Sequence, residues 1–198
     1  MSEHLEIEQK FDVETGFERP SFGALAGVTA AEPQLHHLSA TYYDTADQRL
    51  AASKITLRRR TGGTDEGWHL KLPADAGARR EVHAPLGAAD EPVPGELADR
   101  VAEVTGGRQL APIARLDTER TVVTLRSADD RMLAEVADDK VTARRLPDGG
   151  PLRWREVEVE VPEADPGLQR AAADLLLAAG ARPAGHGSKL ARVLDESA

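Results

Sequence analysis

Apolar and polar residues alternate along much of this chain, and a period of two is typical of β-strands with one buried face. Residues 4–13 show the pattern clearly, because Glu6, Glu8 and Lys10 share one face and the apolar residues fall on the other. The same two-faced charged pattern returns at residues 55–60, 68–72 and 154–161. This repetition predicts a set of strands that each carry one charged face.

The expected strands cover residues 4–13, 35–43, 54–60, 67–72, 79–84, 113–126, 131–141 and 152–161. Turn-forming residues at 61–65, 127–130 and 147–150 separate neighbours in this series, which predicts antiparallel hairpins. Helical spacing predicts helices over residues 96–105 and 167–180, and a short helix is expected within residues 20–30.

Strands that outnumber helices in this way predict the α+β class. More narrowly, they predict an eight-stranded antiparallel β-barrel or a strongly curved sheet, with helices packed on the outside, because closure removes exposed strand edges. No repeat of 20–50 residues and no linker divides the chain, so residues 1–198 are expected to form a single domain.

The charged strand faces have two alternative orientations. They either face bulk water, with the apolar faces forming the core, or they line the bore of the barrel. Acidic and basic residues are separated by strand: Glu6, Glu8, Glu156 and Glu158 lie on two strands, and Arg58, Arg60 and Lys71 lie on two others. Solvated surfaces usually mix both signs. The separation therefore favours the bore.

Composition narrows the classes of function. The formal net charge of −9 argues against general nucleic-acid binding, although basic residues cluster locally, and this balance suggests a small anion bound inside. No apolar run approaches eighteen residues, so no membrane partner is expected. The absence of cysteine and the polar, acidic N-terminus are typical of a cytoplasmic protein.

The charged faces also indicate a chemistry. Converging carboxylates offer hard oxygen ligands, which suit Mg²⁺ or Mn²⁺, and opposing arginine and lysine side chains suit phosphate oxygens. Metal and basic groups together would neutralise a triphosphate while a metal-activated or carboxylate-activated water attacks the phosphorus. The expected reaction is hydrolysis without a covalent nucleophile.

The residues resemble those of the CYTH superfamily, the triphosphate tunnel metalloenzymes, whose hallmark is Glu-x-Glu-x-Lys near the N-terminus. In this chain that motif is Glu6-Ile7-Glu8-Gln9-Lys10. Further matches follow in the family's order, at Tyr42-Tyr43-Asp44-Thr45, Leu57-Arg58-Arg59-Arg60, Trp68-His69-Leu70-Lys71-Leu72-Pro73, Arg80-Glu81, Arg120, the carboxylates around Asp138, Glu156-Val157-Glu158 and Ser188-Lys189-Leu190.

The resemblance implies a tunnel of eight antiparallel strands that binds a linear triphosphate. Residues expected to hold phosphate oxygens are Lys10, Arg58, Arg60, Lys71, Arg120 and Lys189. Residues expected to bind metal are Glu6, Glu8, Asp138, Glu156 and Glu158, and the expected catalytic set is Glu6, Glu8, Lys10 and Glu158. Weaker candidates are Glu81, Arg80 and Asp139; Glu135 and Asp139 lie on the strand face opposite Asp138, and either is an alternative to it.

Three classes of function follow from the resemblance. The first is a hydrolase of inorganic tripolyphosphate or of a small organic triphosphate, and the motif Leu-Arg-Arg-Arg followed by Trp-x-Leu-Lys-x-Pro is especially similar to thiamine triphosphatases. Animal members of that group carry an aromatic residue directly before Leu-Arg-Arg-Arg, where this chain has Thr56. This difference favours inorganic triphosphate. The second class is a class IV-type adenylyl cyclase that makes cyclic AMP from ATP.

The third class is a noncatalytic polyphosphate-binding module. Some relatives carry an additional helical, histidine-rich domain associated with polyphosphate, which is not expected within these 198 residues. The intact set of carboxylates favours catalysis, because removing carboxylates would improve affinity for a bare polyanion. Both a monomer and a homodimer are compatible with the sequence.

Overall fold

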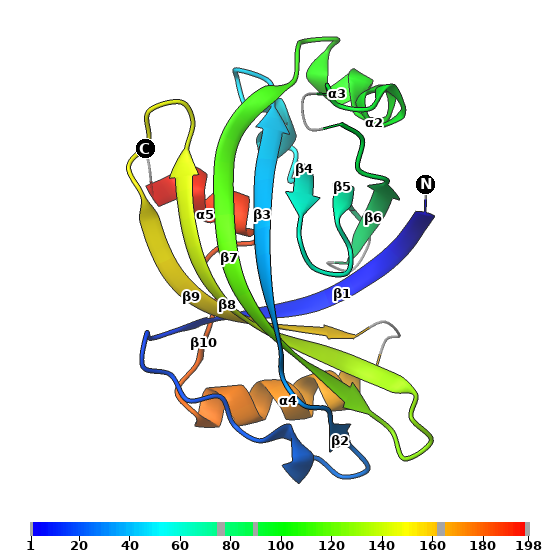
Figure 1. Cartoon of the computed structure of the whole chain (residues 1–198), viewed down its shortest axis with the longest axis vertical. Coiled ribbons are helices and arrows are strands. Elements are labelled where there is room, and N and C mark those ends of the chain that lie inside the picture. Colours follow the sequence, from blue (N-terminus) through cyan, green and yellow to red (C-terminus); the bar gives the residue numbers. More distant parts are fainter. Residues whose placement is uncertain (1, 75–77, 89–90, 162–164, 197–198) are drawn as a thin grey trace.

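Alternating faces produce long strands that pair with one another in an antiparallel sheet. A computed structural model describes residues 2–74, 78–88, 91–161 and 165–196, with the side chains of residues 2 and 4–6 outside this description (Figure 1). The strands are β1 (Ser2–Val13), β2 (Thr29–Ala30), β3 (Gln34–Asp44), β4 (Thr56–Thr61), β5 (Gly67–Pro73), β6 (Arg79–Ala84), β7 (Ala111–Arg126), β8 (Met132–Arg145), β9 (Leu152–Val161) and β10 (Arg182–Pro183).

The sheet has the order β10-β1-β6-β5-β4-β3-β7-β8-β9, and β2 pairs with β7. The first strand joins the two ends of the curl, because residues 2–6 pair with β6 and residues 7–13 pair with β9. The series of pairings that leaves β1 through β6 therefore returns to β1 through β9. The result is a curled, tunnel-like antiparallel sheet, which confirms the predicted α+β class (Figure 1).

The helices are the 3₁₀ turn η1 (Phe22–Ala24), α1 (Arg49–Ala52), α2 (Gly95–Arg100), α3 (Ala102–Thr105), α4 (Pro166–Ala178) and α5 (Lys189–Glu196). The predicted helix over residues 96–105 is two short helices, and the one expected within 20–30 is only a single 3₁₀ turn. Among the described residues, no helix combines the length and the apolar character needed to cross a bilayer.

Two apolar clusters cover the outer face of the sheet. Trp68 and Leu70 of β5 pack with Leu97 of α2, and Val159 of β9 packs with Leu176 of α4. Burial of these side chains is the main contribution to the stability of a domain of this size. Helices α2, α3 and α4 thus lie outside the curl, as the alternation predicts.

Helix α5 departs from that prediction. Its Leu190 and Val193 are buried against Tyr42 of β3 and Val141 of β8. Val141 lies two residues after Asp139, so the two side chains share the inner face of β8. The expectation that all helices pack on the outside is therefore wrong for α5 (Figure 1), which covers part of the inner face. Its first residue, Lys189, lies among the charged side chains.

Candidate active site

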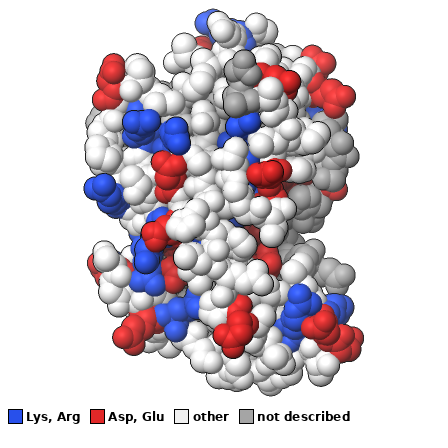
Figure 2. Space-filling model, in the orientation of Figure 1, with Lys and Arg blue, Asp and Glu red and all other residues white. Residues whose placement is uncertain are grey.

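The inward faces of the strands enclose a cavity of about 400 Å³. Its lining is dominated by ionisable groups: Glu8, Lys10, Tyr42, Arg58, Arg60, Asp65, His69, Lys71, Arg79, Glu81, His83, Arg120, Glu135, Glu158, Glu160 and Lys189. The outer surface seen in Figure 2 instead mixes both signs. The charged strand faces thus line an interior, as their separation by strand predicts.

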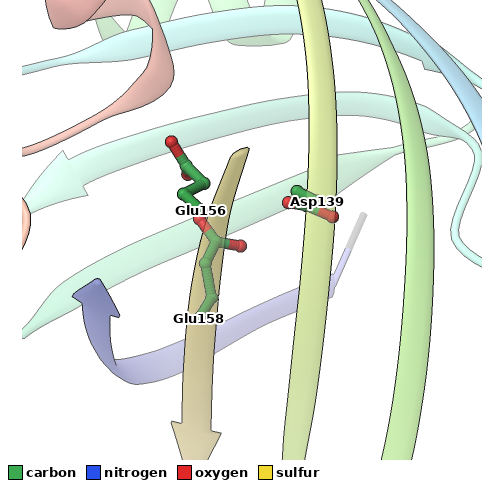
Figure 3. Close-up of side chains that lie close together, drawn as sticks. All are labelled: Asp139, Glu156 and Glu158. Carbon is green, nitrogen blue, oxygen red and sulfur yellow. The ribbon is translucent and has the colours of Figure 1, made fainter. Parts of the chain in front are cut away.

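Three buried carboxylates form one side of this interior. Asp139 of β8 lies opposite Glu156 of β9 in the strand register, and Glu158 lies two residues further along β9 on the same face. One oxygen from each of the three lies within 4.8 Å of the others (Figure 3). Among the side chains that the structure describes, this is the group whose spacing suits a metal ion.

Three basic side chains neutralise the carboxylates. Lys189 Nζ lies 2.8 Å from Asp139 Oδ2, 2.7 Å from Glu156 Oε1 and 2.8 Å from Glu158 Oε1. Arg120 donates from Nε and Nη2 to Asp139, at 2.8 and 2.6 Å, and from Nη2 to Glu158 at 2.7 Å. Lys10 contacts Glu158 and lies 3.0 Å from Glu8 Oε2. The buried charges are therefore paired, as low polarity requires.

The pairing determines how these groups ionise. Burial would raise the pKa of Glu158, but Lys10, Lys189 and Arg120 outweigh it and hold that pKa well below its usual range. Burial likewise opposes the charge on Lys189, yet Asp139, Glu156 and Glu158 raise its pKa well above the ordinary value. Glu158 is therefore ionised and able to act as a metal ligand at neutral pH.

Arginines form the opposite side of the cavity. Arg58 of β4 reaches Tyr42 Oη at 3.4 Å, and Arg60 contacts Asp65 in the turn between β4 and β5. The Nε atoms of both arginines are buried and lack a hydrogen-bond partner among the described residues. Burial, reinforced by Arg58 and Arg120, lowers the pKa of Arg60 to about 9. A buried guanidinium with unused donors is suited to an incoming anion.

His69 of β5 and Glu81 of β6 are hydrogen-bonded to one another across these neighbouring strands. His69 Nδ1 lies 2.7 Å from Glu81 Oε1, and its Nε2 lies 2.9 Å from the carbonyl oxygen of Asp65. Burial lowers the pKa of His69 to about 4, although the hydrogen bond with Glu81 acts in the other direction. Lys71 Nζ lies 3.7 Å from Glu81 Oε2. Glu81, a weaker candidate in the sequence, is thus a buried member of the cavity.

Asp138, predicted from the sequence as a metal ligand, is not brought to this cavity or to the group of three carboxylates. Its carboxylate accepts two hydrogen bonds from Arg155, at 2.9 and 2.8 Å. Arg155 also donates to the carbonyl oxygens of Thr15 and Phe17. The pair lies on the outer face because Asp138 stands opposite Val157 in the register, whereas the neighbouring Asp139 stands opposite Glu156.

One other predicted residue lies elsewhere, and the side chain of a second is not described. Arg80 is mostly exposed and pairs with Glu3 at 3.3 Å, so it does not reach the cavity. Glu6 belongs to β1, and its side chain is outside the described part of the structure. The remaining predicted residues are brought together. Nine of them line the cavity: Glu8, Lys10, Arg58, Arg60, Lys71, Glu81, Arg120, Glu158 and Lys189. Asp139 and Glu156 join them through the group of three carboxylates.

The cavity also contains residues that the predicted site lacks. Arg79 of β6 lines it and donates from Nη2 to the Gly187 carbonyl oxygen at 2.7 Å. Glu135, which the sequence offers as an alternative to Asp138, lines it too, as does Glu160 opposite it on β9. Their parity on the strands matches that of Asp139 and Glu158.

The Tyr-Tyr-Asp-Thr motif is in part structural. Asp44 is fully buried, and its carboxylate accepts hydrogen bonds from the backbone N–H groups of Thr45, Leu50 and Ala51 at 2.6, 2.9 and 2.9 Å. It therefore holds α1 against the end of β3. Only Tyr42 of this motif faces the cavity.

The donor set fits a hard divalent cation. Asp139, Glu156 and Glu158 supply only carboxylate oxygens, which Mg²⁺ and Mn²⁺ prefer. Glu156 Oε1 is buried and accepts no hydrogen bond from the described residues, although Lys189 Nζ lies 2.7 Å away. A carboxylate oxygen left in this state offers a coordination position.

Comparison with known proteins agrees with this architecture. A model of the CYTH domain matches residues 4–192. Two curated relatives, the uncharacterized proteins MT2285 and Rv2226 of Mycobacterium tuberculosis strains, are each 46% identical over 206 residues that cover 96% of this chain. The chain spans 40% of the length of these relatives.

Solved structures show the same fold. A candidate adenylate cyclase from Bacillus halodurans has a TM-score of 0.69 and 18% identity, with 97% of this chain and 98% of that chain covered. A protein from Hippeastrum, described as a candidate adenylyl cyclase with a dominant triphosphatase activity, has a TM-score of 0.54 and 18% identity, with 98% and 96% covered. At such identities the likeness concerns the fold alone.

Proposed function

The chain belongs to the CYTH domain family, and on that premise we propose that it is a metal-dependent hydrolase of a linear triphosphate. Inorganic tripolyphosphate is the proposed substrate, with small organic triphosphates such as thiamine triphosphate as the next candidates. The observation that carries the proposal is that carboxylates of β8 and β9 and the guanidinium groups of Arg58 and Arg60 of β4 meet at one cavity.

The basic side of the cavity would hold the phosphates. Arg58 and Arg60 of β4 each present a planar guanidinium, which can contact two phosphate oxygens at once, and Lys71 of β5 adds a point charge. These groups project from paired strands of the sheet, which fixes their backbone positions. Several cations that line one cavity suit a linear anion that carries a charge on each phosphate.

The acidic side would hold the metal and order the attacking water. Asp139, Glu156 and Glu158 are the proposed ligands. When bound, Mg²⁺ or Mn²⁺ supplies charge neutralisation at the phosphates and lowers the pKa of a coordinated water. Glu8, which lies beside Lys10 and lines the same cavity, would accept a proton from water. No covalent nucleophile is required.

A second candidate, the cyclase, is supported by one feature. A recess of about 470 Å³ adjoins the charged cavity at Thr56, Arg79 and Ser188, and Ile55 and Leu190 contribute apolar surface to it. An organic group attached to the triphosphate, including a nucleoside, could occupy such a recess. The same recess would serve an organic triphosphate that is hydrolysed, so it favours testing organic substrates beside the inorganic one.

The test is phosphate release from tripolyphosphate, thiamine triphosphate and ATP, with Mg²⁺ or Mn²⁺ and with EDTA. ATP reactions are also analysed by chromatography, so that cyclic AMP is detected. We expect metal-dependent phosphate release with tripolyphosphate as the best substrate. Cyclic AMP formation would support the cyclase instead, and tight polyphosphate binding without turnover would support a noncatalytic module.

The setting of the activity is also part of the proposal. We propose that residues 1–198 act as a single CYTH-type domain in the cytoplasm, on a small-molecule substrate and without nucleic acid. Because the matched relatives are longer than this chain, the activity proposed concerns this domain.

A further inference from the structure

The ammonium group of Lys189 lies where a metal ion held by the three carboxylates would lie. Its Nζ is within 2.8 Å of one oxygen from each of Asp139, Glu156 and Glu158, and these are the three members of the candidate metal site. Two cations cannot share so small a volume, because their repulsion is strong at low polarity. Metal and the Lys189 ammonium are therefore alternative occupants of one position.

Lys189 is able to leave this position without unfolding its helix. It is the first residue of α5, where Ser188 Oγ accepts a hydrogen bond from the Ala191 N–H. Leu190 and Val193 anchor the helix in the apolar cluster on the inner face. The backbone is thus held in place, while the four-carbon side chain of Lys189 is free to change rotamer.

A triphosphate in the cavity would provide a new partner for the displaced ammonium. Lys189 lines the same cavity as Arg58 and Lys71, which are the proposed phosphate ligands. A bound polyanion would draw Lys189 toward the phosphates and away from the carboxylates. The carboxylates would then carry uncompensated negative charge, which favours a divalent cation.

We propose that Lys189 is an internal cation that competes with the metal for Asp139, Glu156 and Glu158, and that triphosphate relieves this competition. Metal would then bind weakly to the substrate-free protein and tightly once triphosphate is present. Linkage requires the effect to be reciprocal, so metal would raise triphosphate affinity by the same factor. This inference rests on the proposed function for the identity of the polyanion.

The competition is tested by Mn²⁺ binding to the substrate-free protein, measured by titration calorimetry. Lys189→Met removes the ammonium and keeps a side chain of similar length. We expect this variant to bind Mn²⁺ at least about tenfold more tightly than the wild type, because it removes a unit charge from the coordination position. Lys71→Met is the matched control, since it removes a cavity cation beside Glu81, and we expect it to change the affinity by less than about threefold.

Two further measurements keep the test decisive. Lys189→Gln is the second variant, used if Lys189→Met does not fold, and the same increase in Mn²⁺ affinity is expected. Trp154 donates to Glu156 Oε2 at 2.5 Å, so its fluorescence should report metal binding at this carboxylate, measured with Trp68 replaced by Phe. The Trp154 response should reach saturation at lower Mn²⁺ concentration in the Lys189 variants.

Unchanged or weaker Mn²⁺ binding in both Lys189 variants would overturn the inference, as would an equal increase in Lys71→Met. The measurement needs no turnover, so it separates the inference from the proposed function. If the protein hydrolyses tripolyphosphate but loss of Lys189 does not raise Mn²⁺ affinity, the proposed function stands and the competition is wrong. If loss of Lys189 raises Mn²⁺ affinity but the protein does not hydrolyse tripolyphosphate, the competition stands and the proposed function is wrong.

Discussion

Asp138 and Asp139 are adjacent in β8, yet their carboxylates serve opposite faces of the sheet. Asp139 binds Arg120 inside the cavity, and Asp138 binds Arg155 outside it. In both pairs a buried aspartate accepts two hydrogen bonds from a partly buried arginine. The two residues therefore form a natural pair for separating a role in the site from a role in stability.

Asp139→Asn should lower the rate of tripolyphosphate hydrolysis by roughly 100-fold or more, because one charged ligand is lost from the carboxylate group. Asp138→Asn should leave the turnover number nearly unchanged and lower the free energy of unfolding by about 1–3 kcal/mol, since it weakens a buried ion pair. Steady-state kinetics and urea denaturation of both variants check this. Loss of turnover in Asp138→Asn with Asp139→Asn active would reverse the assignment.

Arg60→Ala should chiefly weaken substrate binding. A hydrogen bond to a charged group contributes about 1.5–3 kcal/mol, so we expect KM for tripolyphosphate to rise by roughly 10–100-fold. Arg59→Ala is the matched control, because Arg59 has the opposite parity on β4 and donates to the Gly87 carbonyl oxygen at 3.5 Å. Equal increases in KM for both variants would contradict the inward role of Arg60.

The low pKa of His69 predicts a dependence of stability on pH. The folded pKa of about 4 lies below the value of 6.5 expected for the unfolded chain, so the unfolded state binds the proton more readily between these values. Stability should be complete above pH 6.5 and fall as the pH approaches 4, by on the order of 3 kcal/mol.

Urea denaturation between pH 7 and 5 measures this slope before the carboxylates titrate. His69→Gln should flatten the slope in that range. Stability that instead rises as the pH falls would mean that the His69 imidazole gains its proton in the folded state, with Glu81 and the Asp65 carbonyl oxygen as acceptors.

The structural part of the Tyr-Tyr-Asp-Thr motif gives a prediction that is independent of activity. Asp44→Ala removes the acceptor of three backbone N–H groups, which leaves buried donors without partners. We expect the free energy of unfolding to fall by about 2–4 kcal/mol. Asp47→Ala, which removes an exposed carboxylate nearby, should change it by less than about 0.5 kcal/mol. Equal effects would contradict the role of Asp44.

Strand alternation was sufficient to predict most of the sheet, because one face of each strand is apolar and the other charged. The boundaries of β6 and β9 agree with the expected segments 79–84 and 152–161. Alternation was not sufficient at Asp138-Asp139, where both neighbours are acidic. There the pattern is the same in either phase, and only the pairing of Asp139 with Glu156 across the strands decides which residue faces inward.

Local sequence patterns do not predict where α5 packs, for a related reason. Its apolar residues predict that one face of the helix is buried. They do not predict whether that face packs on the inner or the outer face of the curled sheet. Tyr42 and Val141 supply an apolar patch on an otherwise charged inner surface, and α5 packs there. The contacts of Lys189 with carboxylates of β8 and β9 follow from this packing and have no signal in the spacing of residues.

The central claim is that the charged cavity catalyses metal-dependent hydrolysis. It is tested most directly by the rate of phosphate release from tripolyphosphate, measured for the wild type and Glu8→Gln across a Mg²⁺ titration and in EDTA. We predict a saturable rise in rate with Mg²⁺ for the wild type, none in EDTA, and loss of turnover in Glu8→Gln with the fold intact by circular dichroism. Full activity in EDTA or in Glu8→Gln would contradict the account.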